Sequence, residues 1–447
     1  MRYLPHTEEE IRSMLQAIGV NTIESLFESI PKRDRLAGPL KLPPPLNEIE
    51  LRQLLREISR KNAHGEEWAS FLGGGAYSHY IPSAASHLIQ RGEFLTAYTP
   101  YQPEVSQGTL QAIFEFQTMA AEILGMEIAN ASNYDGSTAT AEAVLMALRL
   151  NERPKVLIGR SIHPEYRAVI ETYLNNQRVQ IETIPFGPEG TLDRNFLKRN
   201  IDDKTACVVA ATPNFFGVVD DVTDVAENAH QHGALLITTT SEPLAFGLFR
   251  SPGEMGADIA VAEGQSFGNP VSLGGPSLGL FATLKKHARS VPGRLVGETT
   301  DQEGKRGFVL TLSTREQHIR RERATSNICT NVSLCALAAT ITLSLWGKQG
   351  FQKLAQTNYQ NALELRERIK KIANLSSPFE STHFNEFVIR LPKVTSGVLK
   401  KLQKEKILGG VPLDALYPEL ENSLLICTTE MNSDDDRDRL VRALENL

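Results

Sequence analysis

The sequence predicts an α/β protein with a mostly parallel sheet, and three observations support this fold class. Short apolar runs typical of buried strands alternate with helical segments through the middle of the chain, which predicts helices on both faces of the sheet. Polar residues follow several of these runs directly, as expected where strands end at a binding crevice. The length of 447 residues allows two or three domains and a large core. The expected strands are residues 155–159, 178–184, 206–211, 234–239, 259–262 and 278–283.

Composition and charge argue against several classes of protein. Hydrophobic residues make up 41% of the chain and charged residues 22%, which is typical of a globular protein. The net charge of -6 gives no electrostatic case for binding nucleic acid. The acidic N-terminus lacks the apolar core of a signal peptide, and the longest apolar run, residues 332–346, is shorter than the ~20 residues that span a bilayer. We therefore expect a cytoplasmic protein with no membrane segment.

The cysteines carry no chemistry in this interpretation. No two of them form a CxxC pair, so neither a metal site nor a disulfide framework is indicated. We expect reduced, buried thiols. The four are Cys207, Cys329, Cys335 and Cys427.

Residues 1–70 are expected to form a helical arm. Two capping boxes, each with glutamate three positions after the cap residue, mark helix starts at Thr7 and Asn47. The first helix ends at Gly19, and a second short helix is expected at residues 23–30. Each helix has only a narrow apolar stripe, so the arm must pack on the main domain or on a partner.

A large domain is expected over residues 71–320, and it opens with a loop rich in glycine and aromatic residues. The glycines at 73–75 permit close backbone approach, while Tyr98 and Tyr101 offer rigid amphipathic side chains. The loop is either a well-packed surface loop or the wall of a pocket or interface. An amphipathic helix is expected next, at residues 108–124.

The turn that contains Ser137 and Thr138 opens an Ala-rich helix through Leu150. Free N–H groups and the positive end of the helix dipole at such a turn favour an anion. Alternatively, Asp135 or Ser137 simply caps the helix. Further along, Asn214, Glu242 and Gln265 each follow a predicted strand, which predicts one shared crevice at the carboxyl ends of the strands.

Residues 310–331 concentrate positive charge in an acidic protein. One interpretation is a solvated helix whose arginines pair with Glu316 and Glu322. The other is a site for phosphate or carboxylate, or a surface for an acidic partner. The arginines are Arg315, Arg320, Arg321 and Arg323.

A smaller C-terminal α/β domain is expected over residues 321–447. Its predicted helices are residues 333–346, 350–372, 398–406 and 434–447, and its predicted strands are residues 386–391 and 423–427.

Several long runs together resemble one family, the glycine cleavage system P-proteins, and specifically their N-terminal subunit. The resemblance spans most of the chain, and it implies an aspartate aminotransferase-like, fold-type-I pyridoxal-phosphate architecture for the large domain. The runs are EFLTAYTPYQPEVSQGTLQAIFEFQTM (93–119), NYDGSTATAEA (133–143), DIAVAEGQSFGNPVSLGGP (258–276) and STREQHIRRERATSNICT (313–330).

The resemblance implies that this chain carries no complete catalytic site. Gln265 occupies the position of the Schiff-base lysine, and an amide cannot form an imine. Glu242 falls near the acid that usually pairs with the pyridine nitrogen, so Ser137, Thr138, Glu242 and Gln265 are expected to form a vestigial cofactor site. No metal is expected.

The family also implies partners and a reaction. A lysine-bearing subunit 2 is expected to hold pyridoxal phosphate, in a dimer of heterodimers. Together the subunits would decarboxylate glycine and pass the aminomethyl group to the lipoyl arm of the H-protein. The residues of this chain expected to reach the partner's site or line the lipoyl channel are Tyr98, Thr99, Tyr101, Arg323, Thr325, Ser326 and Asn327.

Two other interpretations remain open from the sequence. The chain is a self-sufficient enzyme if another lysine, Lys285 or Lys286, replaces the missing one, although both are expected on a solvated helix. It is a scaffold or regulatory protein if none of its residues reaches the partner's cofactor.

Overall fold

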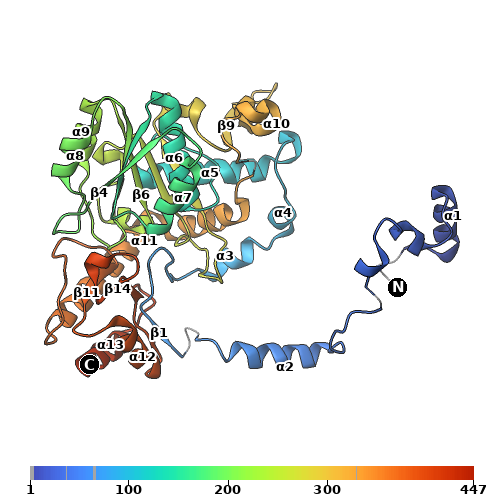
Figure 1. Ribbon diagram of the computed structural model, residues 1–447. Coiled ribbons are helices and arrows are strands. Elements are labelled where there is room, and N and C mark those ends of the chain that lie inside the picture. Colours follow the sequence, from blue (N-terminus) through green and yellow to red (C-terminus); the bar gives the residue numbers. More distant parts are fainter. Residues whose placement is uncertain (1–4, 37, 64–66, 329) are drawn as a thin grey trace. The chain divides into compact units, whose positions relative to one another are not determined.

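The computed structural model describes residues 5–36, 38–63, 67–328 and 330–447 (Figure 1). The chain divides into two compact units, residues 1–63 and residues 64–447. We describe each unit by itself.

The first unit contains the short helices of the expected arm. They are α1 (Glu8–Ile18), η1 (Ile23–Phe27), η2 (Lys32–Asp34) and α2 (Glu48–Ser59). Both predicted capping boxes are present, at Thr7 and Asn47, and Gly19 ends α1 in the left-handed conformation. The expected second helix is one short 3₁₀ segment. Most of the large apolar side chains of this unit are exposed, and Leu15 is an exception.

The second unit is built around a seven-stranded sheet with the order β2-β8-β7-β6-β5-β3-β4. Strands β3 to β7 are parallel, whereas β8 runs antiparallel to β7 and β2 antiparallel to β8. The predicted mostly parallel sheet is therefore confirmed. The strands are β2 (Ile128–Ala129), β3 (Lys155–Gly159), β4 (Gln180–Ile184), β5 (Thr205–Ala211), β6 (Leu235–Thr240), β7 (Ile259–Glu263) and β8 (Gly279–Thr283).

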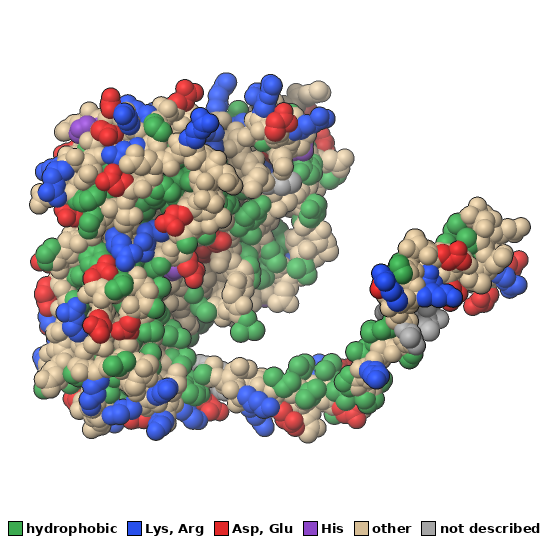
Figure 2. All heavy atoms as spheres, viewed as in Figure 1, with side chains coloured by type: hydrophobic (Ala, Val, Ile, Leu, Met, Phe, Trp, Pro, Cys, Tyr) green, Lys and Arg blue, Asp and Glu red, His purple; other side chains and the backbone are tan. Residues whose placement is uncertain are grey.

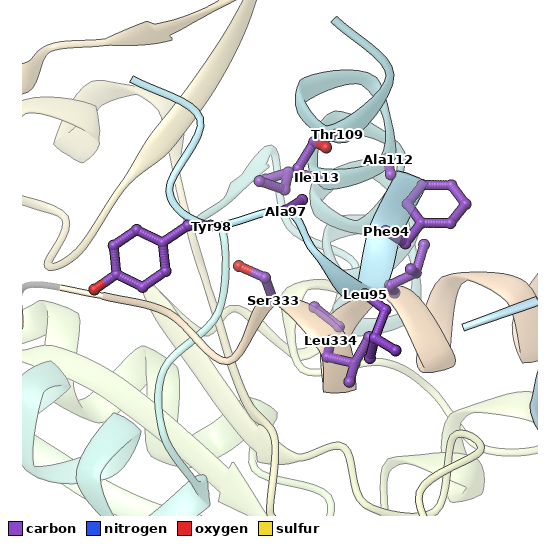
Figure 3. A pocket seen from close by; sticks show the side chains of 11 residues that line it. Phe94, Leu95, Ala97, Tyr98, Thr109, Ala112, Ile113, Ser333 and Leu334 are labelled. Carbon is purple, nitrogen blue, oxygen red and sulfur yellow. The ribbon is translucent and has the colours of Figure 1, made fainter. Parts of the chain in front are cut away.

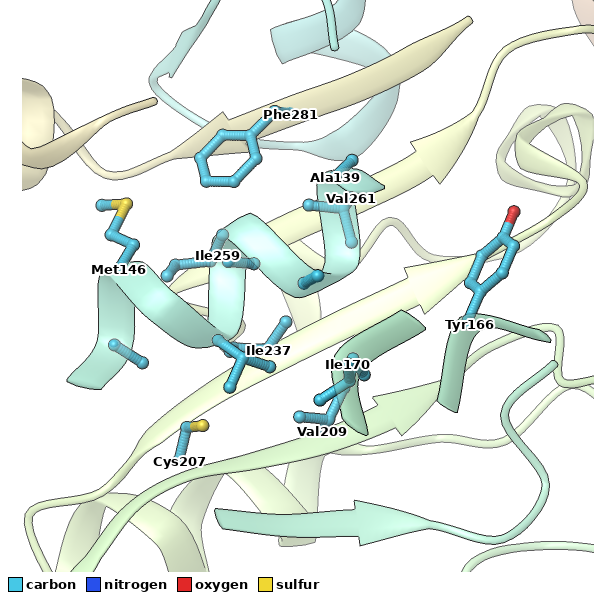
Figure 4. Packing of buried hydrophobic residues seen from close by; sticks show 14 of the residues in the cluster. Ala139, Met146, Tyr166, Ile170, Cys207, Val209, Ile237, Ile259, Val261 and Phe281 are labelled. Carbon is cyan, nitrogen blue, oxygen red and sulfur yellow. The ribbon is translucent and has the colours of Figure 1, made fainter. Parts of the chain in front are cut away.

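Helices cover both faces of this sheet, which explains why its strands read as continuous apolar runs. In β5, Val209 lies beside Ile237 of β6 and Ile170 of α7, in a cluster that also includes Ala139 of α6 (Figure 4). The next residue back, Val208, packs with α8 and α9 on the other face. The helices of this region are α5 (Gln107–Leu124), α6 (Gly136–Asn151), α7 (Pro164–Leu174), α8 (Arg194–Asn200) and α9 (Thr223–Gln231).

A hairpin and an irregular segment follow the large sheet. The hairpin of β9 (Leu295–Thr300) and β10 (Arg306–Thr311) was not expected from the sequence, and its Phe308 packs on α5. The solvated helix considered for residues 310–331 is wrong, because after the end of β10 the described residues of that segment form only short helical turns. These turns are η7 (Ser313–Arg315), α10 (Gln317–Arg320) and η8 (Arg321–Arg323).

The C-terminal part contains a long helix and a small antiparallel sheet of order β11-β14-β13. Gly347 breaks the long helix α11 (Ser333–Lys370), which confirms the two predicted helices on either side of it. Near the small sheet, β1 (Ala69–Ser70) pairs with β12 (Ile407–Leu408) although the two lie far apart in sequence. The other elements are β11 (Glu386–Arg390), α12 (Thr395–Lys404), β13 (Val411–Pro412), β14 (Ser423–Cys427) and α13 (Asp434–Glu445).

The remaining short helices lie in connections: α3 (Ser83–Leu88), α4 (Gly92–Leu95), η3 (Pro103–Val105), η4 (Pro243–Gly247), η5 (Gly253–Met255), η6 (Lys285–Ser290) and η9 (Pro418–Leu420). Acidic and basic side chains alternate over the visible surface of the second unit (Figure 2).

Cys207, Cys335 and Cys427 are free and buried, as expected, whereas Cys329 lies outside the described residues. Within the described part of the chain, no helix is long and apolar enough to cross a membrane.

Candidate functional site

A cavity of about 310 Å³ lies at the carboxyl ends of the parallel strands. Its wall combines the glycine turn at residues 73–76 with the start of α6, the start of α7, the end of β7 and the loop at residues 270–277. A crevice is thus present at the strand ends, and Gln265 and Ser137 line it, but Asn214 and Glu242, which were expected to share it, do not.

Gln265 lies just beyond β7 and is held in place by its own hydrogen bonds. Its Oε1 accepts from the backbone N–H of Tyr77 at 2.9 Å, and its Nε2 donates to the Tyr77 carbonyl at 3.1 Å. Nε2 also donates to the carbonyl of Asn269 at 2.6 Å. Gln265 as a whole is only 6% exposed, so these hydrogen bonds lie in a buried environment. An amide with its donors and acceptor engaged in this way offers no nucleophile.

Carboxylates already occupy the start of α6. Asp135 is the N-cap: its Oδ1 accepts from the Thr138 N–H at 2.7 Å and from the Ser137 hydroxyl at 2.6 Å. The N–H of Gly136 donates to Oε2 of Glu263 at 2.9 Å. The geometry therefore favours the capping interpretation of this turn over an anion site.

The charge of the cavity does not suit a phosphate group. Asp135, Glu165 and Glu263 line it, and among its described lining residues none is lysine or arginine. Burial raises the pKa of Glu263 to about 7, although three backbone N–H donors act in the opposite direction. Without a lysine, a cation or a free helix terminus, the residues present do not fit pyridoxal phosphate.

The carboxylate of Glu242, the second residue expected at this site, contacts His79 and does not enter the cavity. Its Oε2 is 2.9 Å from Nε2 of His79 and accepts from the Ser266 hydroxyl at 3.0 Å. Nδ1 of His79 is 2.9 Å from Oε2 of Glu430. Burial lowers the pKa of His79, but the two carboxylates outweigh it and raise that pKa to about 10. Glu242 thus has an internal cationic partner and does not line the 310 Å³ cavity.

Several residues of the site were missed in the sequence. The Tyr77 hydroxyl donates to Glu386 at 2.7 Å, and Glu386 also accepts from the N–H of Gly74 at 2.6 Å. The ring of His163 stacks on Tyr166 at the rim of the cavity, with centroids 4.9 Å apart. The three adjacent glycines were a signal of close packing, but nothing in the sequence indicated which carboxylates they approach.

The residues expected to reach a partner lie away from this cavity. The Tyr98 side chain lies beside a separate cavity of about 80 Å³, and its ring points away from Phe94 and Leu334 (Figure 3). Tyr98 is 81% exposed. Arg294 instead binds the next two polar residues of the loop. Its Nη1 donates to the Thr99 hydroxyl at 3.3 Å, and its Nη2 donates to the Tyr101 hydroxyl at 2.8 Å. The aromatic loop therefore presents one free ring and two anchored side chains.

The arginine-rich segment has the same combination of exposed and anchored residues. Arg323 and Asn327 are exposed. The Thr325 N–H donates to the Arg315 carbonyl at 3.0 Å, and the Ser326 hydroxyl donates to buried Glu142 at 2.8 Å. None of these four lines the cavity at Gln265.

The two candidate replacement lysines are also remote from the cavity. Lys285 and Lys286 are exposed on η6, and Lys286 lies 3.9 Å from Asp258. Neither lines the cavity at Gln265.

Comparisons with known proteins agree with the resemblance found in the sequence. The family model described as glycine cleavage system P-protein matches residues 1–444. A probable glycine dehydrogenase (decarboxylating) subunit 1 from Sorangium cellulosum is 51% identical, with 99% of each chain covered. A relative of the same description from Rhodospirillum centenum is 50% identical over the full length of both chains.

Solved structures show the same relationship. The crystal structure of glycine decarboxylase (P-protein) of the glycine cleavage system, in inhibitor-bound form, has a TM-score of 0.90 and 43% identity and covers both chains fully. Sphingosine-1-phosphate lyase of Burkholderia pseudomallei has a TM-score of 0.66 at 15% identity, covering 92% of this chain and 93% of the other, and shows the fold alone. That fold is the fold-type-I α/β architecture expected for the large domain. The chain belongs to the glycine cleavage system P-protein family.

Proposed function

We propose that this chain is subunit 1 of a glycine dehydrogenase (decarboxylating) and that it completes a site whose lysine lies on a second subunit. The observation that carries this proposal is Gln265, an amide fixed to the Tyr77 backbone where the resemblance places a lysine. The relatives with about half of their residues identical bear the same subunit description, which supports a two-subunit enzyme.

In this proposal the partner subunit holds pyridoxal phosphate, which supplies the electron sink for loss of carbon dioxide from glycine. This chain contributes walls rather than the reacting group. Tyr98 is exposed on its surface, and Arg294 holds the neighbouring Thr99 and Tyr101 by hydrogen bonds. Rigid aromatic side chains are well suited to orient a bound arm and to exclude water.

The arginine-rich segment is the second proposed contribution. Arg323 is exposed and carries a charge that suits a phosphate or carboxylate group. Thr325, Ser326 and Asn327 follow it along the chain. The Thr325 backbone is held by the Arg315 carbonyl, and the Ser326 hydroxyl is held by Glu142. We assign these residues to the partner's site or to the channel for the lipoyl arm of the H-protein, in a dimer of heterodimers.

No contact made by the described residues favours a self-sufficient enzyme. Lys285 and Lys286 lie on an exposed helix outside the cavity, so neither is placed to replace the missing lysine. A pure scaffold would leave Tyr98 and Arg323 without effect on turnover.

The decisive test is spectroscopic. We expect the purified chain mixed with pyridoxal phosphate to give no visible band that borohydride reduction fixes onto a lysine. Adding the lysine-bearing subunit and lipoylated H-protein should then produce glycine decarboxylation. A lysine adduct on this chain alone would contradict the proposal, and so would full activity of the partner subunit without this chain.

A further inference from the structure

Arg294 lies immediately before β9 and is one of the few arginines buried in the described chain, with 4% exposure. Its Nη1 donates to the Thr99 hydroxyl at 3.3 Å, and its Nη2 donates to the Tyr101 hydroxyl at 2.8 Å. The guanidinium carbon also lies 5.1 Å from the centroid of the Tyr101 ring. One cation therefore fixes two residues of the aromatic loop.

The same side chain contacts the arginine-rich segment. Nε of Arg294 lies 3.6 Å from Oε2 of Glu316, and both side chains are buried. Glu316 is also 3.5 Å from Nδ1 of His318, whose ring packs edge-on against Tyr101. The two segments, about 200 residues apart in sequence, thus meet at the Arg294 guanidinium and at the adjacent contact between the His318 and Tyr101 rings.

We propose that Arg294 is a positioning residue that locks the aromatic loop and the arginine-rich segment together, so that both face the partner subunit in one arrangement. The proposal rests on the function proposed above. A buried charge is costly unless its partners are in place, so Arg294 favours the state in which Thr99, Tyr101 and Glu316 are all docked. The planar fork of arginine lets Arg294 donate to two hydroxyls while its charge stays close to the Glu316 carboxylate.

Other contacts of the arginine-rich segment's described residues hold that segment without joining it to the aromatic loop. Arg315 donates to the carbonyl of Gly293 at 3.1 Å, and Ser326 donates to Glu142, which holds the arginine-rich segment at its two ends. Those contacts do not reach Thr99 or Tyr101. Among the described residues, Arg294 and the His318–Tyr101 ring contact link the two segments.

The first test uses the full chain and needs no activity. Hydrogen exchange measured by mass spectrometry should rise by about tenfold in residues 97–102 and 316–321 together in Arg294→Met. Arg294→Lys, which keeps the charge but not the fork, should give an intermediate rise. Arg366→Met is the matched control, since Arg366 is equally buried but contacts Glu380 and the Phe379 carbonyl in the C-terminal part. Unchanged exchange in either segment of Arg294→Met overturns the proposal.

The second test uses the complex with the lysine-bearing subunit and H-protein. With assembly intact, kcat/KM should fall about 10- to 100-fold in Arg294→Met and recover in part in Arg294→Lys. Tyr101→Phe should lower turnover in the wild type but add nothing in the Arg294→Met background, because the coupling is already lost.

Tyr98→Ala separates the two proposals, because Tyr98 does not contact Arg294. Impaired turnover in Tyr98→Ala with normal turnover in Arg294→Met overturns the positioning role alone. Normal turnover in both variants overturns the assignment of the aromatic loop to the partner's site and the positioning role with it.

Discussion

Glutamine and lysine make different demands on a buried position. Gln265 needs a donor and acceptors, and the backbone of Tyr77 supplies both. A lysine there would leave the Tyr77 N–H without its acceptor, and an unpaired buried donor costs about 1–3 kcal/mol. The surroundings of position 265 are therefore built for an amide, which explains how a strand-end cavity persists without its nucleophile.

His79 predicts a pH dependence of stability. Its pKa is about 10 in the folded chain and 6.5 in its ordinary state, because Glu242 and Glu430 outweigh the effect of burial. A raised pKa stabilises the fold fully below about pH 6.5, and this contribution is lost as the pH rises toward 10. Thermal unfolding across pH 6–10 should therefore show the advantage of wild type over His79→Gln shrinking with pH.

His383→Gln is the control for that experiment. Burial lowers the pKa of His383 to about 4, so the residue stays neutral across the same range. The difference in thermal stability between His383→Gln and wild type should therefore be constant above about pH 7. Parallel curves for wild type and His79→Gln would contradict the charged state assigned to His79.

At the scale of elements, the start of α6 tolerates no side chain at its first position. A Cβ on Gly136 would lie 2.3 Å from the Tyr166 hydroxyl and 3.1 Å from Cβ of Glu263. Gly136→Ala should destabilise the chain by about 1–3 kcal/mol, because Tyr166 is stacked against His163 and cannot move freely. Urea denaturation would measure the change.

Gly108 of α5 supplies the matched comparison, since no atom lies within 4 Å of its Cβ position. Gly108→Ala should stabilise by about 0.5–1 kcal/mol through the lower entropy of the unfolded chain. If both variants changed the free energy of unfolding in the same direction, close packing at Gly136 would not be the cause of its intolerance to a side chain.

The elements differ in how far the sequence predicts them. The strand at residues 206–211 was predicted because burial on both faces leaves an unbroken apolar run. The β9–β10 hairpin was missed because its strands mix apolar, glycine and charged residues. The solvated helix considered for residues 310–331 failed because Leu312 and Arg321 have positive φ, which spacing alone does not reveal.

The site was only partly predictable for a related reason. Strand ends located Gln265 and Glu242, and the resemblance gave Gln265 its meaning. Besides partners close in sequence, Gln265 binds the backbone of Tyr77 and Glu242 contacts His79, which lie 188 and 163 positions away. A local pattern contains no information about such distant partners, so the bonds between Gln265 and the Tyr77 backbone and the burial of His79 became known only from the fold.

At the scale of the whole molecule, the first unit exposes more apolar surface than an independent segment needs. On α2, Leu51 and Leu55 are 44% and 54% exposed. If this stripe contacts the partner subunit, Leu51→Gln with Leu55→Gln should weaken association about 10-fold or more. Gln53→Ala on the same helix is the control, and analytical ultracentrifugation of the mixed subunits is the measurement. Equal affinities for all forms would show that the stripe serves another contact.

The segment from β1 to His79 is completed by residues near the other end of the chain. β1 pairs with β12, the Cys427 N–H donates to the Phe71 carbonyl, and His79 contacts Glu430 across 351 positions. During translation, residues 69–79 leave the ribosome long before residues 407–430, with which they pair. This wall of the cavity must therefore wait, with its backbone unpaired, until almost all of the chain has been synthesised. The structure of the Gln265 cavity is thus a late product of translation, and stalled or truncated chains lack it.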